Sequence, residues 1–152
     1  MRFFLMVFLL FGCGYHLGNP FHRKIHLVVP VNKTEYRGVE MELHRLLVAE
    51  IRKSPGFSLS STGVEIQVTV ERCRGIPVYE EEKSPTVGDF YVQVTVVIFR
   101  SPAESHRRTL EALERYDTES GISLEAAKSR ALTRLAQSIV LEILTSFSDA
   151  KK

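Results

Sequence analysis

The side chains that could catalyse a reaction or hold a metal ion are scattered along this chain. His22 and His26 are four residues apart, a spacing that joins two ligands on a helix, but the segment around them has the pattern of an extended strand. Ser105-His106 lacks the glycine-flanked turn of a hydrolase nucleophile, and three adjacent acids, Glu80 to Glu82, are typical of a solvated loop. No HExxH or CxxC motif occurs; the histidines are His16, His22, His26, His44 and His106. We therefore expect no enzyme activity, no metal site and no cofactor.

Cys13 is the residue for which the sequence does predict a reaction. An unbroken apolar run, Phe3 to Phe11, follows the positive charge of Arg2. It has the length of a secretory leader and is too short for a bilayer, which needs about 20 residues. Leu10-Phe11-Gly12-Cys13 resembles the lipobox of bacterial lipoproteins, with a small residue before a thiol that is acylated. A plain secretory leader, or a buried strand with an incidental cysteine, is the alternative.

The lipobox interpretation divides the chain into a signal peptide, residues 1–12, and a single domain, residues 13–152, lipidated at Cys13. One acyl chain adds about 0.8 kcal/mol per buried methylene, so stable attachment takes more than one chain. Gly14 follows the cysteine, in place of the aspartate that commonly retains lipoproteins at the inner membrane. We expect a lipid-anchored protein on the periplasmic side of the outer membrane.

Composition excludes one class of partner and bounds the fold. The formal net charge is only +2, which argues against binding to nucleic acid. The hydrophobic fraction of 44% and the charged fraction of 25% are ordinary for a globular domain. Once Cys13 is acylated, Cys73 is the one remaining thiol, so the domain has no internal disulfide. We expect Cys73 to be a small buried hydrophobe.

Alternating and helical patterns predict six elements. The strands are Lys24–Val31, with Ile25, Leu27, Val29 and Val31 on one face; residues 64–71, with Val64, Ile66, Val68 and Val70 on the dry face; residues 90–99, with Phe90, Val92, Val94, Val96 and Ile98; and Arg107–Tyr116. One helix carries Val39, Leu43, Leu46, Leu47 and Ile51, and a longer one begins at Ser123 and runs to about Phe147. The order β-α-β-β-β-α predicts an α+β two-layer sandwich, with two helices on one face of a four-stranded, mostly antiparallel sheet.

Two pairs of arginines are the candidate ligand contacts. Arg72 and Arg74 follow the second strand, and Arg107 and Arg108 open the fourth. Because the third strand runs antiparallel between them, the pairs should lie at opposite ends of the sheet as two small basic sites. They are either ordinary solubilising charge or contacts for an anionic ligand.

Three segments together resemble the LptE family of lipopolysaccharide-assembly lipoproteins. Cys13-Gly14-Tyr15-His16-Leu17 is similar to the opening of the mature family members, and Val28 to Thr34 (VVPVNKT) looks like their first strand and turn. The helix from Gly121 to Leu144 resembles their alanine-rich C-terminal helix.

The resemblance implies a protein without enzyme activity. LptE-like proteins plug and help to assemble a large outer-membrane β-barrel, the LptD translocon, and bind lipopolysaccharide. The uncharged outer face of the third strand, Tyr91, Gln93 and Thr95, would suit the polar interior wall of a barrel. The alternatives are an activator or structural partner of periplasmic peptidoglycan machinery, and a periplasmic hydrolase.

Overall fold

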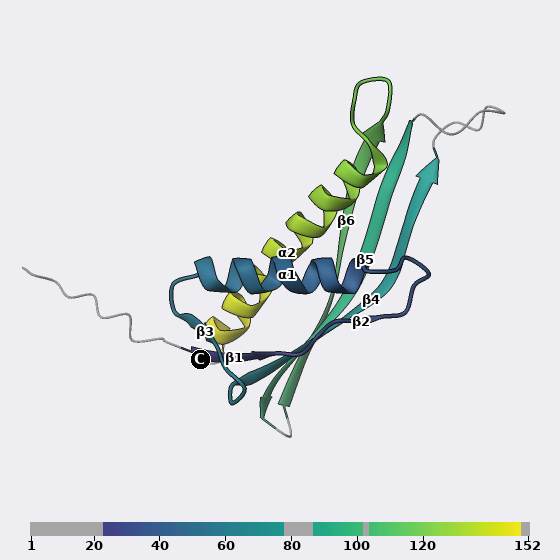
Figure 1. The fold of residues 1–152 in the computed structure, drawn as a ribbon. Coiled ribbons are helices and arrows are strands. Elements are labelled where there is room, and N and C mark those ends of the chain that lie inside the picture. The colour runs from purple at the N-terminus through teal and green to yellow at the C-terminus, as the bar shows by residue number, and fades with distance from the viewer. Residues whose placement is uncertain (1–22, 78–86, 102–103, 150–152) are drawn as a thin grey trace, which may run out of the picture.

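The computed structural model describes residues 23–77, 87–101 and 104–149. The described residues form two helices and six strands that make up two layers (Figure 1). In chain order the elements are β1 (Arg23–Leu27), β2 (Val31–Asn32), α1 (Val39–Lys53), β3 (Phe57–Leu59), β4 (Val64–Pro77), β5 (Val87–Ser101), β6 (Glu104–Asp117) and α2 (Leu124–Asp149).

The α+β class is confirmed, but the prediction of a four-stranded, mostly antiparallel sheet is wrong. The sheet is mixed, with the order β3-β1-β4-β5-β6 and β2 paired to β4 beside β1. Strands β4, β5 and β6 form an antiparallel meander, whereas β1 is parallel to both β3 and β4. The physical reason is α1: a helical crossover returns the chain to the end from which it left, so the strands that it joins run parallel.

The first strand also departs from the predicted Lys24–Val31. Ile25 is buried, and Leu27 packs against the core, but Val29 and Val31 are more than half exposed. Pro30 has no N–H to donate and separates the segment into β1 and β2. After this break Val31 registers with Thr69, on the face that the helices do not cover. Strand β3 has only three residues, too few for an alternating pattern to reveal.

The turn between β2 and α1 is held by Asn32. Its Oδ1 accepts hydrogen bonds from the backbone N–H of Thr34, at 2.9 Å, and from the Thr34 hydroxyl, at 2.8 Å. Its Nδ2 donates to the carbonyl oxygen of Tyr36 and to Oε2 of Glu40. Gly38 follows with φ 81°, a left-handed conformation that glycine adopts without strain, and α1 begins at the next residue. The polar triplet Asn32-Lys33-Thr34, which follows Val31, thus directs the chain into α1.

The core is the interface between the two helices and one face of the sheet. Each predicted helical stripe is buried, with Leu43, Leu47 and Ile51 of α1 and Leu135, Ile139 and Ile143 of α2 at most 1% exposed. The dry rows of β4 and β5 lie beneath them, as predicted. Helix α2 packs over β5 and β6, and α1 packs beside it and against β3. Both helices lie on the same side of the sheet (Figure 1), so its other face is uncovered by any described helix.

No described helix is long and apolar enough to cross a bilayer.

We predict that the two faces of β4 differ sharply in their tolerance of charge. Val68→Asp places an unpaired carboxylate in the core and should lower the free energy of unfolding by several kcal/mol. Thr69→Asp, on the uncovered face, should cost no more than about 1 kcal/mol, the span of strand propensities. Urea unfolding of both variants measures the difference, and equal losses would contradict the assignment of the faces.

Candidate functional site

The predicted site residues fall into two groups. Cys13 and the acids Glu80 to Glu82 lie outside the described residues. Arg72, Arg74, Arg107 and Arg108 are all described, and all four side chains are exposed. Where these arginines point, and what surrounds each of them, therefore decides whether they can form a site.

A β-bulge turns Arg72 and Arg74 away from the helices. The register between β4 and β5 shifts between Val70 and Arg72. Before the shift the even-numbered residues, such as Val68 and Val70, face the core; after it the odd-numbered Cys73 is buried. An uninterrupted alternation would direct both arginines toward α2, so the extra residue of the bulge re-aims them to the uncovered face.

Arg72 and Arg74 form part of a two-row patch across three strands. In the first row, Arg72 pairs with Gln93 of β5, which pairs with Glu111 of β6. In the second row, Arg74 pairs with Tyr91, which pairs with Leu113. Cross-strand neighbours of this kind have Cβ atoms about 5 Å apart. We call these six residues the sheet-face patch: Arg72, Arg74, Tyr91, Gln93, Glu111 and Leu113.

The sheet-face patch offers hydrogen-bond donors and positive charge to a ligand. The Tyr91 hydroxyl donates to Oε2 of Glu111 at 2.8 Å. Partial burial raises the pKa of Tyr91, and the Glu111 carboxylate adds to the shift, whereas the charges of Arg72 and Arg74 oppose it. Tyr91 therefore stays protonated at neutral pH and donates its hydroxyl hydrogen to Glu111, so the donors left for a ligand are the two arginines and Gln93. Neither arginine has an ion-pair partner among the described residues, so both guanidinium groups remain available to an anion.

The structure does not join Arg107 and Arg108 into one site. Adjacent residues of a strand point to opposite faces, so Arg107 lies on the uncovered face and Arg108 points toward α2. There Arg108 Nε lies 3.2 Å from Oε1 of Glu142, and His106 Nε2 lies 2.7 Å from the same oxygen. Arg108 thus takes part in fastening the edge strand β6 to α2. The predicted separation of this pair from Arg72 and Arg74 agrees with the register, which sets Arg107 opposite Val97.

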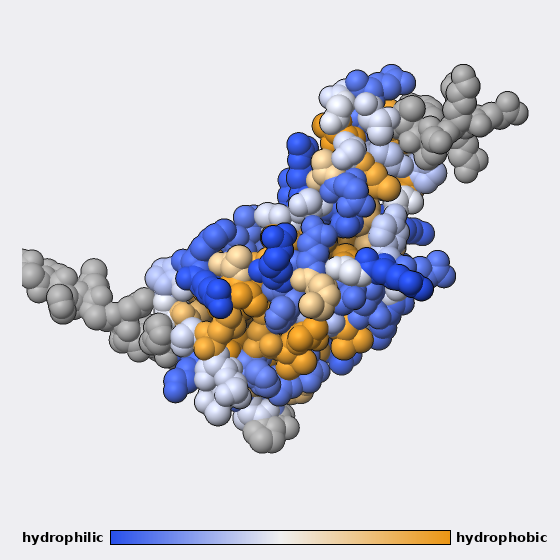
Figure 2. All heavy atoms as spheres, in the orientation of Figure 1, coloured by the Kyte–Doolittle hydropathy of each residue, from blue (hydrophilic) through white to orange (hydrophobic). Residues whose placement is uncertain are grey.

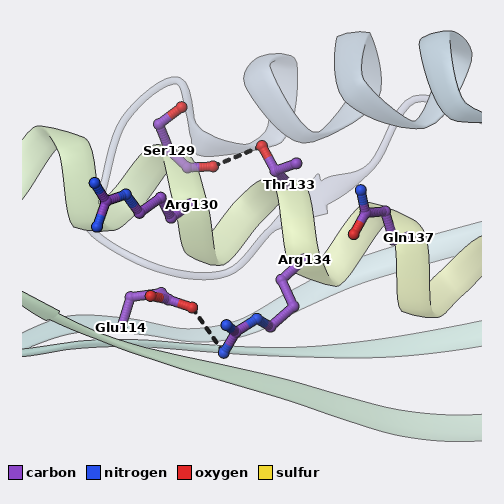
Figure 3. Close-up of a pocket in the computed structure, with 6 residues that line it drawn as sticks. All are labelled: Glu114, Ser129, Arg130, Thr133, Arg134 and Gln137. Carbon is purple, nitrogen blue, oxygen red and sulfur yellow. Dashed lines mark hydrogen bonds and ion pairs between the residues drawn. The ribbon is translucent and has the colours of Figure 1, made fainter.

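Besides the sheet-face patch, a basic hollow that the sequence analysis did not identify lies between α2 and β6 (Figure 3). Arg134 Nη1 is 2.7 Å from Oε1 of Glu114, while Arg130 extends from the helix without an ion-pair partner in the described part of the chain. The hollow has a volume of about 280 Å³, and its lining residues are Glu114, Ser129, Arg130, Thr133, Arg134 and Gln137. The sequence does contain a signal for this hollow, because Arg130 and Arg134 are four residues apart and so lie next to each other on the polar side of the predicted helix.

The remaining reactive groups do not extend either site toward catalysis. Cys73 is buried, as predicted, and burial raises the pKa of its thiol to about 11, so at neutral pH it is a poor nucleophile. Within residues 23–77, 87–101 and 104–149, no group of three potential ligands could hold a metal ion. The exposed guanidinium groups of the sheet-face patch have the chemistry that suits an anionic group.

Comparison of the sequence with protein-family models gives no match. Comparison with curated proteins gives no match either. Solved structures do share the fold. A Xanthomonas campestris protein of the DUF330 family has a TM-score of 0.66 at 13% identity, over 86% of this chain and 89% of that one. Rare lipoprotein B from Shewanella oneidensis has a TM-score of 0.58 at 10% identity, over 86% of this chain and 100% of that one.

A third structure with this fold is the minor lipoprotein from Acinetobacter baumannii. It has a TM-score of 0.50 at 17% identity, over 82% of this chain and 92% of that one. Similarities at such low identity establish the fold alone. This α+β fold is therefore one that bacterial lipoproteins adopt.

We predict that Glu142 makes the attachment of β6 to α2 sensitive to acid. Burial opposes ionisation of this carboxyl, but hydrogen bonds from His106 and Arg108 outweigh it and lower its pKa. A lowered folded-state pKa contributes stability that is present above the ordinary carboxyl pKa and lost as the pH falls through the folded-state value. The melting temperature of Glu142→Gln should therefore change less than that of the wild type between pH 6 and about pH 3. Parallel curves would contradict this role.

Proposed function

We propose that this protein is an outer-membrane lipoprotein of the LptE type, which plugs and helps to assemble an LptD-like β-barrel and binds lipopolysaccharide. It acts by binding, without a catalytic step. The observation that carries the ligand-binding part is the pair of arginines, Arg72 and Arg74, that a bulge places beside Tyr91 on the uncovered sheet face. Neither arginine has an ion-pair partner in the described part of the chain. Guanidinium groups grip phosphates and carboxylates with two parallel hydrogen bonds, and the head of lipopolysaccharide carries both anions.

The lipid anchor rests on the N-terminal sequence. The apolar run before Gly12-Cys13 and the CGYHL segment that follows are features of a lipoprotein precursor. The fold shared with rare lipoprotein B and with the minor lipoprotein supports the same class. In this proposal Cys13 is the sole anchor, and the folded domain reaches the periplasm from it.

The barrel contact is assigned to the part of the uncovered sheet face beyond the patch. Thr69, Thr95 and Thr109 form one row across β4, β5 and β6. Such a row presents hydroxyls and methyl groups without charge, which suits the polar lumen wall of a large barrel. The runner-up function, a partner of peptidoglycan machinery, would use the same face for a different protein.

We predict that Arg72→Ala/Arg74→Ala weakens lipopolysaccharide binding. Each lost charge-assisted contact should reduce the affinity by about tenfold or more. Residues 14–152, free of acyl chains, are titrated with lipopolysaccharide while the melting temperature is followed separately. Arg107→Ala, which removes one unpaired charge elsewhere on the same face, is the control and should bind like the wild type. Full affinity in the double variant would remove the sheet-face patch from the ligand site.

We predict that the acylated protein copurifies with a very large outer-membrane barrel. Cells expressing the wild type and Cys13→Ala are fractionated, and the protein is captured from detergent-solubilised membranes and analysed by mass spectrometry. The variant should remain unprocessed at Gly12 and lose its acyl mass. Capture of a bitopic peptidoglycan synthase in place of a barrel would favour the runner-up, and processing before position 13 in the variant would contradict the anchor.

A further inference from the structure

The side of the helical layer that faces away from the sheet carries several exposed basic side chains, and the face drawn in Figure 2 mixes hydrophilic and hydrophobic surface. Among the described side chains of α1 and α2, the exposed charged ones are Arg45, Arg52, Lys53, Arg130, Arg134 and a single acid, Glu125. The other acids whose exposure is described are less exposed and have partners: Glu40 with Asn32, Glu42 with Lys128, Glu50 with Lys53, and Glu142 with β6. Three exposed arginines of the helices, Arg45, Arg52 and Arg130, thus have no ion-pair partner among the described residues.

The same side exposes large apolar side chains. Met41 of α1 is 59% exposed, and Leu141 and Leu144 of α2 are 61% and 39% exposed. On α2 the two leucines continue the line of Arg130, Arg134 and Gln137, because the intervals alternate between four and three residues. Basic groups at one end of this line and leucines at the other make an amphiphilic stripe about 20 Å long.

The hollow in Figure 3 gives the stripe a receptor for a phosphate. Arg130, Ser129 and Gln137 are among the residues that line it, and Arg134 is held there by Glu114. The hydroxyl of Thr133 donates to the carbonyl oxygen of Ser129, at 2.8 Å, and is not free to donate elsewhere. The hollow thus contains two arginines against one carboxylate. One of the arginines, Arg130, has no ion-pair partner among the described residues.

We propose that this helix face, which comprises Met41, Arg45, Arg130, Arg134, Leu141 and Leu144, docks on an anionic phospholipid surface. The arginines contact lipid phosphates, and the leucines and the methionine enter the interfacial region. Three apolar side chains hold a protein only weakly, so the docking rests on the proposed acyl anchor, which keeps the domain at the membrane. In this docked state the sheet-face patch, on the opposite side of the two-layer domain, faces the periplasm, so docking on lipid and plugging of a barrel are alternative states of the protein.

Charge and spacing favour a lipid surface over a second copy of the chain. In a parallel pairing of two α2 stripes, Arg130 and Arg134 would face the same arginines of the other copy. In an antiparallel pairing centred on Gln137, the arginines would face Leu141 and Leu144. Neither arrangement pairs unlike charges, whereas a membrane rich in phosphatidylglycerol offers phosphates to the arginines and acyl chains to the leucines.

The test is performed on the acylated full-length protein in vesicles. Gln137→Cys on the helix face, or Thr109→Cys on the uncovered sheet face, carries a polarity-sensitive fluorophore; buried Cys73 does not compete for the label. In vesicles of phosphatidylcholine and phosphatidylglycerol, the probe at 137 should shift to the blue and be quenched by brominated acyl chains. The probe at 109 should do neither, and vesicles of phosphatidylcholine alone should reduce the signal at 137.

Charge variants separate docking from nonspecific attraction. Arg45→Gln/Arg130→Gln breaks no ion pair of the described residues and should lower the ratio of docked to undocked protein by about 30-fold. Arg107→Gln/Arg115→Gln removes the same charge from the other face and should leave the ratio unchanged. Equal quenching at both probe sites, an equal loss in both variants, or dimerisation that shields the probe at 137 without lipid would overturn the proposal.

The outcome is separable from that of the proposed function. The acyl mass on Cys13, the captured barrel and the lipopolysaccharide titration test the function and use other residues. If Cys13 carries no lipid, Cys13→Ser is added so that the fluorophore stays at position 137 or 109, and this unacylated protein is mixed with the same vesicles at high lipid concentration. A blue shift at 137 that Arg45→Gln/Arg130→Gln abolishes would still support docking, and no shift would overturn it.

Discussion

The burial of one face of β5 is the constraint on which the rest of the structure depends. Phe90, Val92, Val94, Val96 and Ile98 are at most 1% exposed, and α2 packs over them while α1 packs against α2 and β3. A slip of one residue in the register would exchange this row for Tyr91, Gln93 and Thr95 and expose the apolar side chains. The register of the meander is therefore fixed by hydrophobic burial. With it fixed, each side chain of β4, β5 and β6 is committed to the helix side or to the uncovered side.

The bulge in β4 is a place where the meander departs from that rule, and the candidate site lies there. The extra residue between Val70 and Arg72 leaves Cys73 in the core and sends two arginines outward, beside Tyr91. The same commitment of faces separates Arg107 from Arg108. One of these points to solvent, and the other joins His106 on the Glu142 carboxylate. Arginines that look equivalent in the sequence thus have different surroundings. Successive side chains of a strand point to opposite faces, and a bulge shifts this alternation by one residue.

The two layers give the domain two surfaces of different chemistry. The sheet face combines an uncharged threonine row with the sheet-face patch, which suits recognition of a barrel wall and of an anionic head group. The helix face is basic, with exposed leucines in line with arginines, which suits a phospholipid surface. A single anchor at Cys13 would keep the domain at the membrane in either state, with the helix face on lipid or the sheet face against a barrel.

The local sequence determined every feature that depends on period alone. The helical stripes, the dry rows of β4 and β5 and the α+β class follow from spacings of 3.6 and 2 residues, which near neighbours impose on one another. Only the tertiary structure decided which strands pair and where their registers shift. It made the sheet mixed through the α1 crossover, added the three-residue β3, turned Val31 to the uncovered face after Pro30, and directed Arg72 and Arg74 outward at the bulge. These outcomes depend on strands and helices that are distant along the chain. The hydrogen bonds and buried area that such contacts contribute do not appear as a repeating pattern of residues in the segment itself.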